Sequence, residues 1–143
     1  MLDITGINHV GIRVSNKDAS LNFYEQLGFE RGPDHGFDQG HPVVMKHPCG
    51  LVLNILGIAT ADVGNNVLMD IDGKHSGITH FAVTVNSLDA AKQLVGDLGI
   101  EITGNFSFGG MSAIFIRDPD RNVIEIDAYD NAPDHPDGYA GHD

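Results

Sequence analysis

The sequence predicts an α+β fold built from two tandem βαβββ modules. Three observations support this prediction: the chain resembles itself at a fixed offset, each copy passes from a strand-like to a helical pattern, and three short strand-like stretches follow each helical segment. With 143 residues the chain has the length of one domain. We therefore expect a single domain over residues 1–143, with a cupped mixed sheet and the helices outside it.

The repeat is visible in three separated segments. INHVGIRV (7–14) resembles ITHFAVTV (78–85), with an offset of 71 residues from His9 to His80. The same offset aligns SNKDASLNFYEQLGF with NSLDAAKQLVGDLGI, and LVLNIL (51–56) with NVIEID (122–127). Asn54 then takes the place that Glu125 has in the second copy. One offset that aligns three segments indicates a duplicated module.

Each copy contains the same series of elements. Its first stretch alternates apolar and other residues at period 2, which predicts a strand. A helix follows, with Ser15 or Ser87 near its start and a Leu-Gly pair at its end. We expect three further strands at about 29–32, 42–47 and 51–56, and in the second copy at about 100–105, 111–117 and 123–129. The boundaries are a first module at 4–56, a linker at 57–77, a second module at 78–129 and a flexible acidic tail at 130–143.

Polar residues interrupt the apolar opening and closing strands of both copies. These residues are His9 and Asn54 in the first copy, and His80 and Glu125 in the second. Period 2 places Glu125 on the face opposite Ile124 and Ile126, which would pack on the helix. A buried imidazole or carboxylate needs a partner. Two histidines and one carboxylate suit a divalent ion with open coordination positions, so we predict that His9, His80 and Glu125 bind a metal.

The composition excludes several functions. A formal net charge of -12 argues against binding to nucleic acid, whose phosphates require Lys and Arg. No apolar run approaches the roughly 20 residues of a membrane span. The N-terminal sequence MLDITGINHV lacks the pattern of a secretory signal, so we expect a cytoplasmic protein that does not associate with membranes.

The duplicated module, the N-H-V motif of the opening strand and DPDRNVIEI near the end resemble the vicinal oxygen chelate family. This family includes glyoxalase I, methylmalonyl-CoA epimerase, fosfomycin-resistance enzymes, extradiol dioxygenases and bleomycin-resistance binding proteins. The resemblance covers about residues 4–129. It implies a small-molecule substrate, a homodimer, and a divalent ion (Fe, Mn, Zn or Ni) at the positions of His9, Asn54, His80 and Glu125.

Asn54 separates the functions that the resemblance allows. Glyoxalase I has a Glu or Gln at this position and needs a proton acceptor beside the metal, whereas asparagine cannot accept a proton at neutral pH. Fosfomycin enzymes need several cations, for which only Arg13, Lys46 and Arg117 are candidates. The triad therefore favours an extradiol dioxygenase-like oxidoreductase, with Glu125 and Asn54 as catalytic residues. A glyoxalase I-like lyase or isomerase is the first alternative, and a metal-free binding protein of the bleomycin-resistance type is the second.

Overall fold

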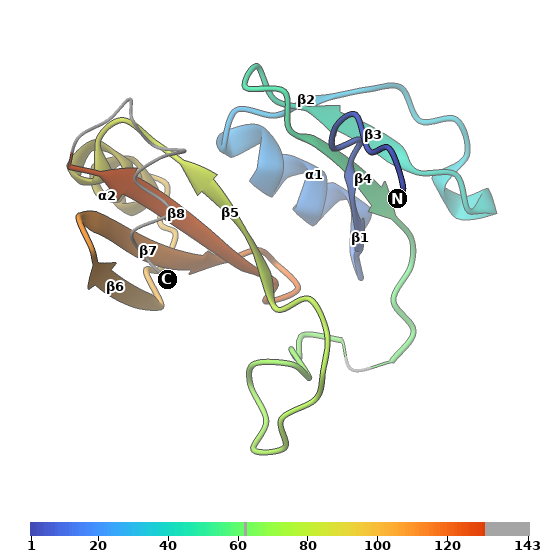
Figure 1. Cartoon of the computed structure of the whole chain (residues 1–143). Helices are drawn as coiled ribbons and strands as arrows, with labels where there is room; N and C mark the ends of the chain where they lie inside the picture. Colours follow the sequence, from blue (N-terminus) through green and yellow to red (C-terminus); the bar gives the residue numbers. More distant parts are fainter. Residues whose placement is uncertain (62, 131–143) are drawn as a thin grey trace. The chain divides into compact units, whose positions relative to one another are not determined.

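The computed structural model describes residues 1–61 and 63–130 (Figure 1). The chain divides into two compact units, Met1–Gly64 (unit 1) and Asn65–Asp143 (unit 2). Each unit contains one α-helix and one four-stranded mixed sheet, and unit 1 has a short 3-10 helix as well. The strand orders are β1-β4-β3-β2 in unit 1 and β5-β8-β7-β6 in unit 2. The prediction of two βαβββ modules is therefore confirmed, and neither sheet closes into a barrel.

Unit 1 follows the predicted order of elements. They are β1 (Val10–Arg13), α1 (Lys17–Gln26), β2 (Glu30–Arg31), the short 3-10 helix η1 (Phe37–Gln39), β3 (Val43–Lys46) and β4 (Val52–Leu56). In unit 2 they are β5 (His80–Thr84), α2 (Leu88–Asp97), β6 (Gly104–Phe108), β7 (Met111–Arg117) and β8 (Val123–Tyr129). In the part of the chain described, no helix is long and apolar enough to cross a membrane.

The register of the sheets confirms the offset of 71 residues. The opening and closing strands pair in parallel in both units, with Gly11 opposite Asn54 and Ala82 opposite Glu125. The antiparallel pair beside them repeats as well, since Val44 lies opposite Asn54 and Phe115 lies opposite Glu125. Asn54 and Glu125 therefore occupy equivalent positions.

The helices begin and end at equivalent residues. Asn16 and Ser87 are the N-caps, and their side chains accept hydrogen bonds from the backbone N–H groups of Ala19 and Ala90. The first helix thus starts from Asn16 and not from the neighbouring Ser15. Both helices end at the predicted Leu-Gly pair, where Gly28 (φ 101°) and Gly99 (φ 72°) adopt the left-handed conformation that glycine allows.

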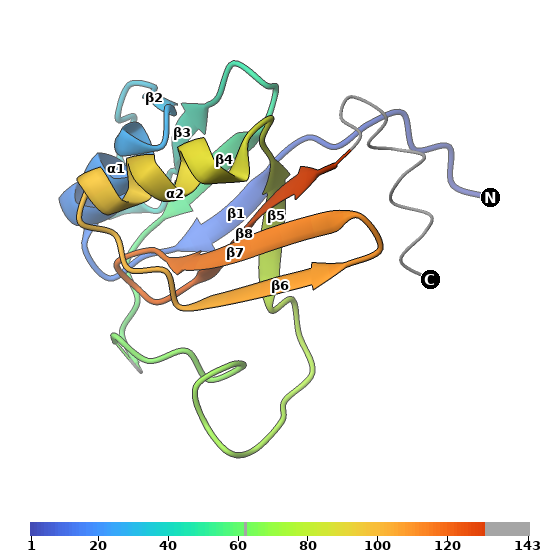
Figure 2. The ribbon, with the colours of Figure 1, turned by 90° about the vertical axis from the view of Figure 1, so that its left-hand side faces the viewer.

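In each unit a core lies between the helix and one face of the sheet, and in unit 2 the other face carries a second buried cluster of Met111, Ala113 and Tyr129, against which Phe115 packs. In unit 2, Ile114, Ile116 and Ile124 are fully buried on the face that contacts α2. In unit 1, Leu53 and Ile55 are fully buried, and Tyr24 of α1 packs its ring edge-on against Phe29. Figure 2 shows the helix α2 lying across β7 and β8. Because side chains alternate along a strand, Asn54 and Glu125 project from the opposite, open faces.

The outer strand of unit 2 departs from the prediction. The bond from Gly32 N–H to the Val44 carbonyl in unit 1 has its equivalent in the bond from Thr103 N–H to the Phe115 carbonyl. Beyond it, however, Gly104 pairs with Phe115, so that two residues oppose one. Such an irregularity is typical of a β-bulge, and the strand expected at 100–105 begins only at Gly104. The predicted tail lies outside the described residues except for Asp130.

Candidate metal centre

The open face of unit 2 gathers polar groups around β8. One row across the sheet runs from Ala82 through Glu125 to Phe115, and the next runs from Thr84 through Asp127 to Ala113. Glu125 and Asp127 are two residues apart on one strand and point to the same side. Ala113 and Asp127 are buried on this face, whereas Ala82 is exposed and Glu125 is half-buried.

His80 and Glu125, two of the three residues predicted as metal ligands, lie close together in unit 2. Nε2 of His80 lies 3.4 Å from Oε1 of Glu125. The other ring nitrogen, Nδ1, is 2.8 Å from the Thr79 hydroxyl oxygen, and the ring stands edge-on to Phe115 with the centroids 6.2 Å apart. These contacts orient the imidazole with Nε2 toward the carboxylate, while Nδ1 has a hydrogen-bonding neighbour, as the non-ligating nitrogen of a metal-binding histidine usually has.

Asp127 is a buried acid that sequence reasoning placed on the face of Glu125 but gave no function. The residue is 3% exposed, and within residues 1–61 and 63–130 no hydrogen-bond partner is found for its Oδ1. Burial, followed by the contact with the Glu125 carboxyl group, raises the pKa of Asp127 to about 7. The period-2 pattern already contained this signal, since a second acid two residues from a candidate ligand shares its face.

The side chains of unit 2 include groups of the kinds that bind a divalent cation. They are an imidazole whose Nδ1 contacts the Thr79 hydroxyl group, the half-buried carboxylate of Glu125, and the buried Asp127 oxygen Oδ1, for which no hydrogen-bond partner is found among the described residues. A 2+ ion would offset the repulsion between adjacent carboxylates. Among the described residues, no group of three or more His, Cys, Asp or Glu side chains is placed to hold a metal ion, so the structure brings together only the pair His80 and Glu125, and the three-ligand site stays a prediction.

In unit 1 the structure places His9 differently from the expectation. His9 is exposed and immediately precedes β1, and His80 is the first residue of β5, so neither lies in the middle of a strand. Nδ1 of His9 lies 2.6 Å from the Asn8 side-chain oxygen. Nε2 is therefore the ring nitrogen whose lone pair could bind a metal. Asn54 is half-buried on the open face of β4. The place of His9 and Asn54 in a common site remains a prediction from the repeat.

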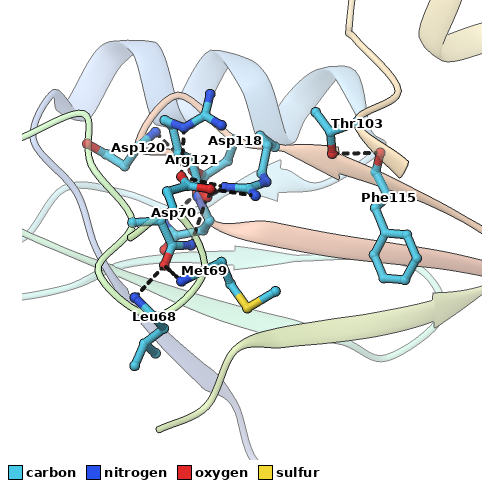
Figure 3. A network of polar contacts seen from close by, with 11 residues as sticks. Leu68, Met69, Asp70, Thr103, Phe115, Asp118, Asp120 and Arg121 are labelled. Carbon is cyan, nitrogen blue, oxygen red and sulfur yellow. Dashed lines mark hydrogen bonds and ion pairs between the residues drawn. The ribbon is translucent and has the colours of Figure 1, made fainter. Parts of the chain in front are cut away.

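The arginine on the open face of unit 2 is already paired. Asp70, in the segment between the modules, accepts hydrogen bonds of 2.9 and 3.0 Å from the two terminal nitrogens of Arg117 and one of 2.9 Å from Nε of Arg121. Figure 3 shows the Asp70 carboxylate beside Arg121. The bonds from Arg117 and then Arg121 lower the pKa of Asp70 to about 2. Arg117 is therefore not the free cation that the sequence suggested.

Comparison with known families identifies the fold of these modules. Residues 6–126 match the family model described as Glyoxalase/Bleomycin resistance protein/Dioxygenase superfamily. The chain belongs to this superfamily. The resemblance inferred from the repeat and from the closing motif is thereby confirmed.

Solved structures of the superfamily fold are similar over nearly their whole length. The protein SMU.1112c is 26% identical, with a TM-score of 0.71 over 87% of this chain and 99% of that one. A glyoxalase/dioxygenase from Nostoc punctiforme is 19% identical (TM-score 0.69; 87% and 91% covered). A mutant of the fosfomycin resistance protein FosX from Listeria monocytogenes, complexed with Mn(II) and 1S,2S-dihydroxypropylphosphonic acid, is 17% identical (TM-score 0.65; 92% and 94% covered). No curated protein matches the sequence.

The similarity therefore shows the superfamily and its fold. Superfamily proteins include one that binds Mn(II) together with a small molecule.

Proposed function

We propose that this chain is a divalent-metal-dependent enzyme that chelates a small substrate through two vicinal oxygens, with His9, His80 and Glu125 as the metal ligands. The observation that carries the proposal is the contact between Nε2 of His80 and the Glu125 carboxylate on an open sheet face. The repeat adds His9, which has the same place before β1 that His80 has at the start of β5.

The ligand set supports an extradiol dioxygenase-like oxidoreductase as the reaction class. When bound, the ion would act as a Lewis acid on the vicinal oxygens of the substrate. Three protein ligands leave coordination positions free for those oxygens. Asn54 can donate a hydrogen bond but cannot accept a proton at neutral pH, so it suits the orientation of a bound oxygen better than proton abstraction.

Two alternatives remain open and differ in what they require of the chain. A glyoxalase I-like lyase or isomerase would need Glu125 to be both ligand and proton acceptor. A metal-free binding protein would leave the His80–Glu125 pair without a chemical task. The dioxygenase is preferred because it needs no proton acceptor at Asn54.

The test is the metal content of protein purified without chelators, combined with activity assays. We expect one divalent ion per chain in the wild type and loss of most of it in His80→Ala, because two remaining ligands rarely hold such an ion. His75→Ala, which changes an exposed histidine of the same unit, should keep the metal. Equal metal content in His80→Ala would contradict the proposed site.

The activity assays separate the reaction classes. Oxygen uptake with catechols would support the dioxygenase, and isomerisation of a glutathione hemithioacetal would support the lyase. If the protein has no metal and neither activity, the binding protein is the surviving alternative.

A further inference from the structure

The open face of unit 1 carries a hollow that the sequence did not reveal. It has a volume of about 400 Å³ and lies over β2 and β3. Its apolar walls include Gly32, Pro33, Pro42 and Val44. Val44 lies directly opposite Asn54 in the sheet, so the hollow is on the same face as this candidate catalytic residue.

Differences between the modules explain why the hollow exists in unit 1. Val44 takes the place that the larger Phe115 has in unit 2. Gly32 contributes no side chain, and a Cβ atom there would lie 3.0 Å from the carbonyl oxygen of Val44. The floor is therefore formed by a valine on β3 and by a glycine directly after β2.

The wall formed by the loop between β2 and β3 is anchored. Asp34 accepts hydrogen bonds from the backbone N–H groups of Gly36 and Phe37 and from Nζ of Lys17. The Phe37 ring is 3% exposed and lies close to Gly57. These contacts hold the loop against unit 1, so the hollow is a preformed feature of this module.

Glu30 and Lys46 place one negative and one positive charge at the hollow. They face each other across β2 and β3, and both line it. Arg31 also lines the hollow, but its guanidinium group is held by Glu25 and Asn22 of α1. Among the described residues, no ion pair of Glu30 or Lys46 is found, in contrast to Arg117, the equivalent of Lys46, which is paired with Asp70. The hollow therefore offers an apolar floor, a pair of opposite charges and, from the loop between β2 and β3, the exposed imidazole of His35.

We propose that this hollow binds a small molecule with an apolar body and an amino-acid-like end, whose carboxylate contacts Lys46 and whose ammonium group contacts Glu30. Such a zwitterion satisfies both charges, whereas a doubly negative phosphonate would meet one lysine and an opposing glutamate. Binding of this molecule does not depend on the proposed function. Its role as the substrate of the enzyme rests on that function. One strand spacing of about 4.8 Å separates Val44 from Asn54. The apolar part of a molecule bound in the hollow would therefore lie beside Asn54 on the same face of the sheet.

The experiment compares four probes that share a phenylethyl body and differ in charge. They are L-phenylalanine, 3-phenylpropionate, 2-phenylethylamine and 2-phenylethylphosphonate, each titrated into the full chain while backbone amide shifts are followed by NMR. We expect saturable shifts at Gly32, Val44 and Lys46. L-Phenylalanine should bind roughly two- to fivefold more tightly than the singly charged probes, since each exposed ion pair contributes little.

Charge-removing variants test the two contacts separately. Lys46→Met and Glu30→Gln should each reduce the affinity for L-phenylalanine to that of a singly charged probe. Lys92→Met and Glu101→Gln, at exposed positions of unit 2, serve as matched controls and should leave the affinity unchanged. The amide spectra show at the same time that each variant is folded.

Three results would overturn the proposal: no saturable shift with any probe, shifts that map outside the hollow, or 3-phenylpropionate binding as tightly as L-phenylalanine with no effect of Glu30→Gln. Failure of this proposal is distinguishable from failure of the metal centre. Binding of L-phenylalanine to a chain that holds no metal would leave the hollow and remove the metal site, and metal without probe binding would do the opposite.

Discussion

The two modules share one backbone plan and differ where side chains meet the open face. Glu125, Phe115 and Arg117 of unit 2 correspond to Asn54, Val44 and Lys46 of unit 1. In unit 2 the Glu125 carboxylate therefore lies beside the His80 imidazole, and Phe115 occupies the neighbouring strand. In unit 1 the Asn54 amide lies opposite Val44, which lines the hollow. The comparison shows that the duplicated fold repeats the backbone positions, whereas the side chains on one face of the sheet differ between the copies.

The turns before the closing strands show the same division. Each of these turns contains one residue with a positive φ angle. The two residues occupy equivalent positions in the repeat: Gly50 has φ 102°, and Arg121 has φ 65°. A non-glycine residue there costs about 1–2 kcal/mol. Arg121 has a reason to be present, because its Nε donates to Asp70. Unit 2 thus tolerates backbone strain to hold the preceding segment, which unit 1 has no need to do.

The largest expected difference between the modules concerns their cores. Tyr24 and Val95 are equivalent, and both are buried, with exposures of 0% and 2%. Tyr24→Ala should destabilise unit 1 by about 3–5 kcal/mol, as for other buried aromatic residues. Val95→Ala should destabilise unit 2 by less, about 1–3 kcal/mol, because fewer carbon atoms leave the core. Denaturant unfolding followed by NMR signals of each unit measures both, and equal losses would show that the cores are not organised as described.

Exchange of the residue on the closing strand makes unit 2 resemble unit 1. Glu125→Asn should weaken metal binding by at least about 100-fold. Loss of a residue that only hydrogen-bonds to a metal ligand already costs about 10–100-fold. Glu101→Gln, which changes an exposed carboxylate of the same unit, is the control and should bind as the wild type does. Titration calorimetry with Mn²⁺ gives both affinities. Unchanged binding in Glu125→Asn would remove the chemical difference between the modules.

The reverse exchange sharpens the comparison. Asn54→Glu adds an anionic oxygen and should tighten metal binding by roughly tenfold if this residue faces the ion. Oxygen-dependent turnover of a catechol should then fall, because a coordination position is occupied, whereas a lyase would gain activity from the added proton acceptor. Asn54→Gln lengthens the side chain without adding charge and is the matched control. Equal affinities of Asn54→Glu and the wild type would place Asn54 away from the metal.

The smallest expected effect is the pH dependence of two anchored loops. Asp70 in unit 2 and Asp34 in unit 1 both have their pKa lowered from 3.8 to about 2, by arginine side chains and by backbone N–H groups respectively. A lowered pKa in the folded state means that the stabilisation is present above about pH 4 and is lost as the pH falls toward 2. Carboxyl ¹³C shifts should give both midpoints near 2. A midpoint for Asp70 near 3.8 would show that the clasp with Arg117 and Arg121 does not form in solution.

Much of the fold was predictable because an element expected in one copy of the repeat is expected at the equivalent residues of the other. The strands at 111–117 and 123–129 agree with the prediction, and alternation correctly placed Glu125 opposite the buried face. The bulge at Gly104 was not predictable, since one extra residue opposite Phe115 leaves the local pattern unchanged. The clasp of Asp70 was missed because its partners are 47 and 51 residues away in the chain.

The site was predictable only in part, for a physical reason. His80 and Glu125 lie on neighbouring strands, so the pattern of one sheet brings them together. His9 belongs to the other module, and no periodicity within a strand determines how residues of different modules meet. The hollow exists because Val44 is smaller than its equivalent Phe115 and leaves space above the sheet. A pattern of polar and apolar residues does not show such empty space.

The central claim is that His9, His80 and Glu125 hold one divalent ion, and pulsed electron paramagnetic resonance of the Mn²⁺-loaded full chain tests it most directly. We expect nitrogen couplings from the imidazoles of His9 and His80, with one coupling lost in His9→Ala, the other lost in His80→Ala, and both kept in His75→Ala. Bound Mn²⁺ whose couplings are unchanged in His9→Ala and His80→Ala would contradict the account, as would a spectrum of the wild type without any imidazole nitrogen.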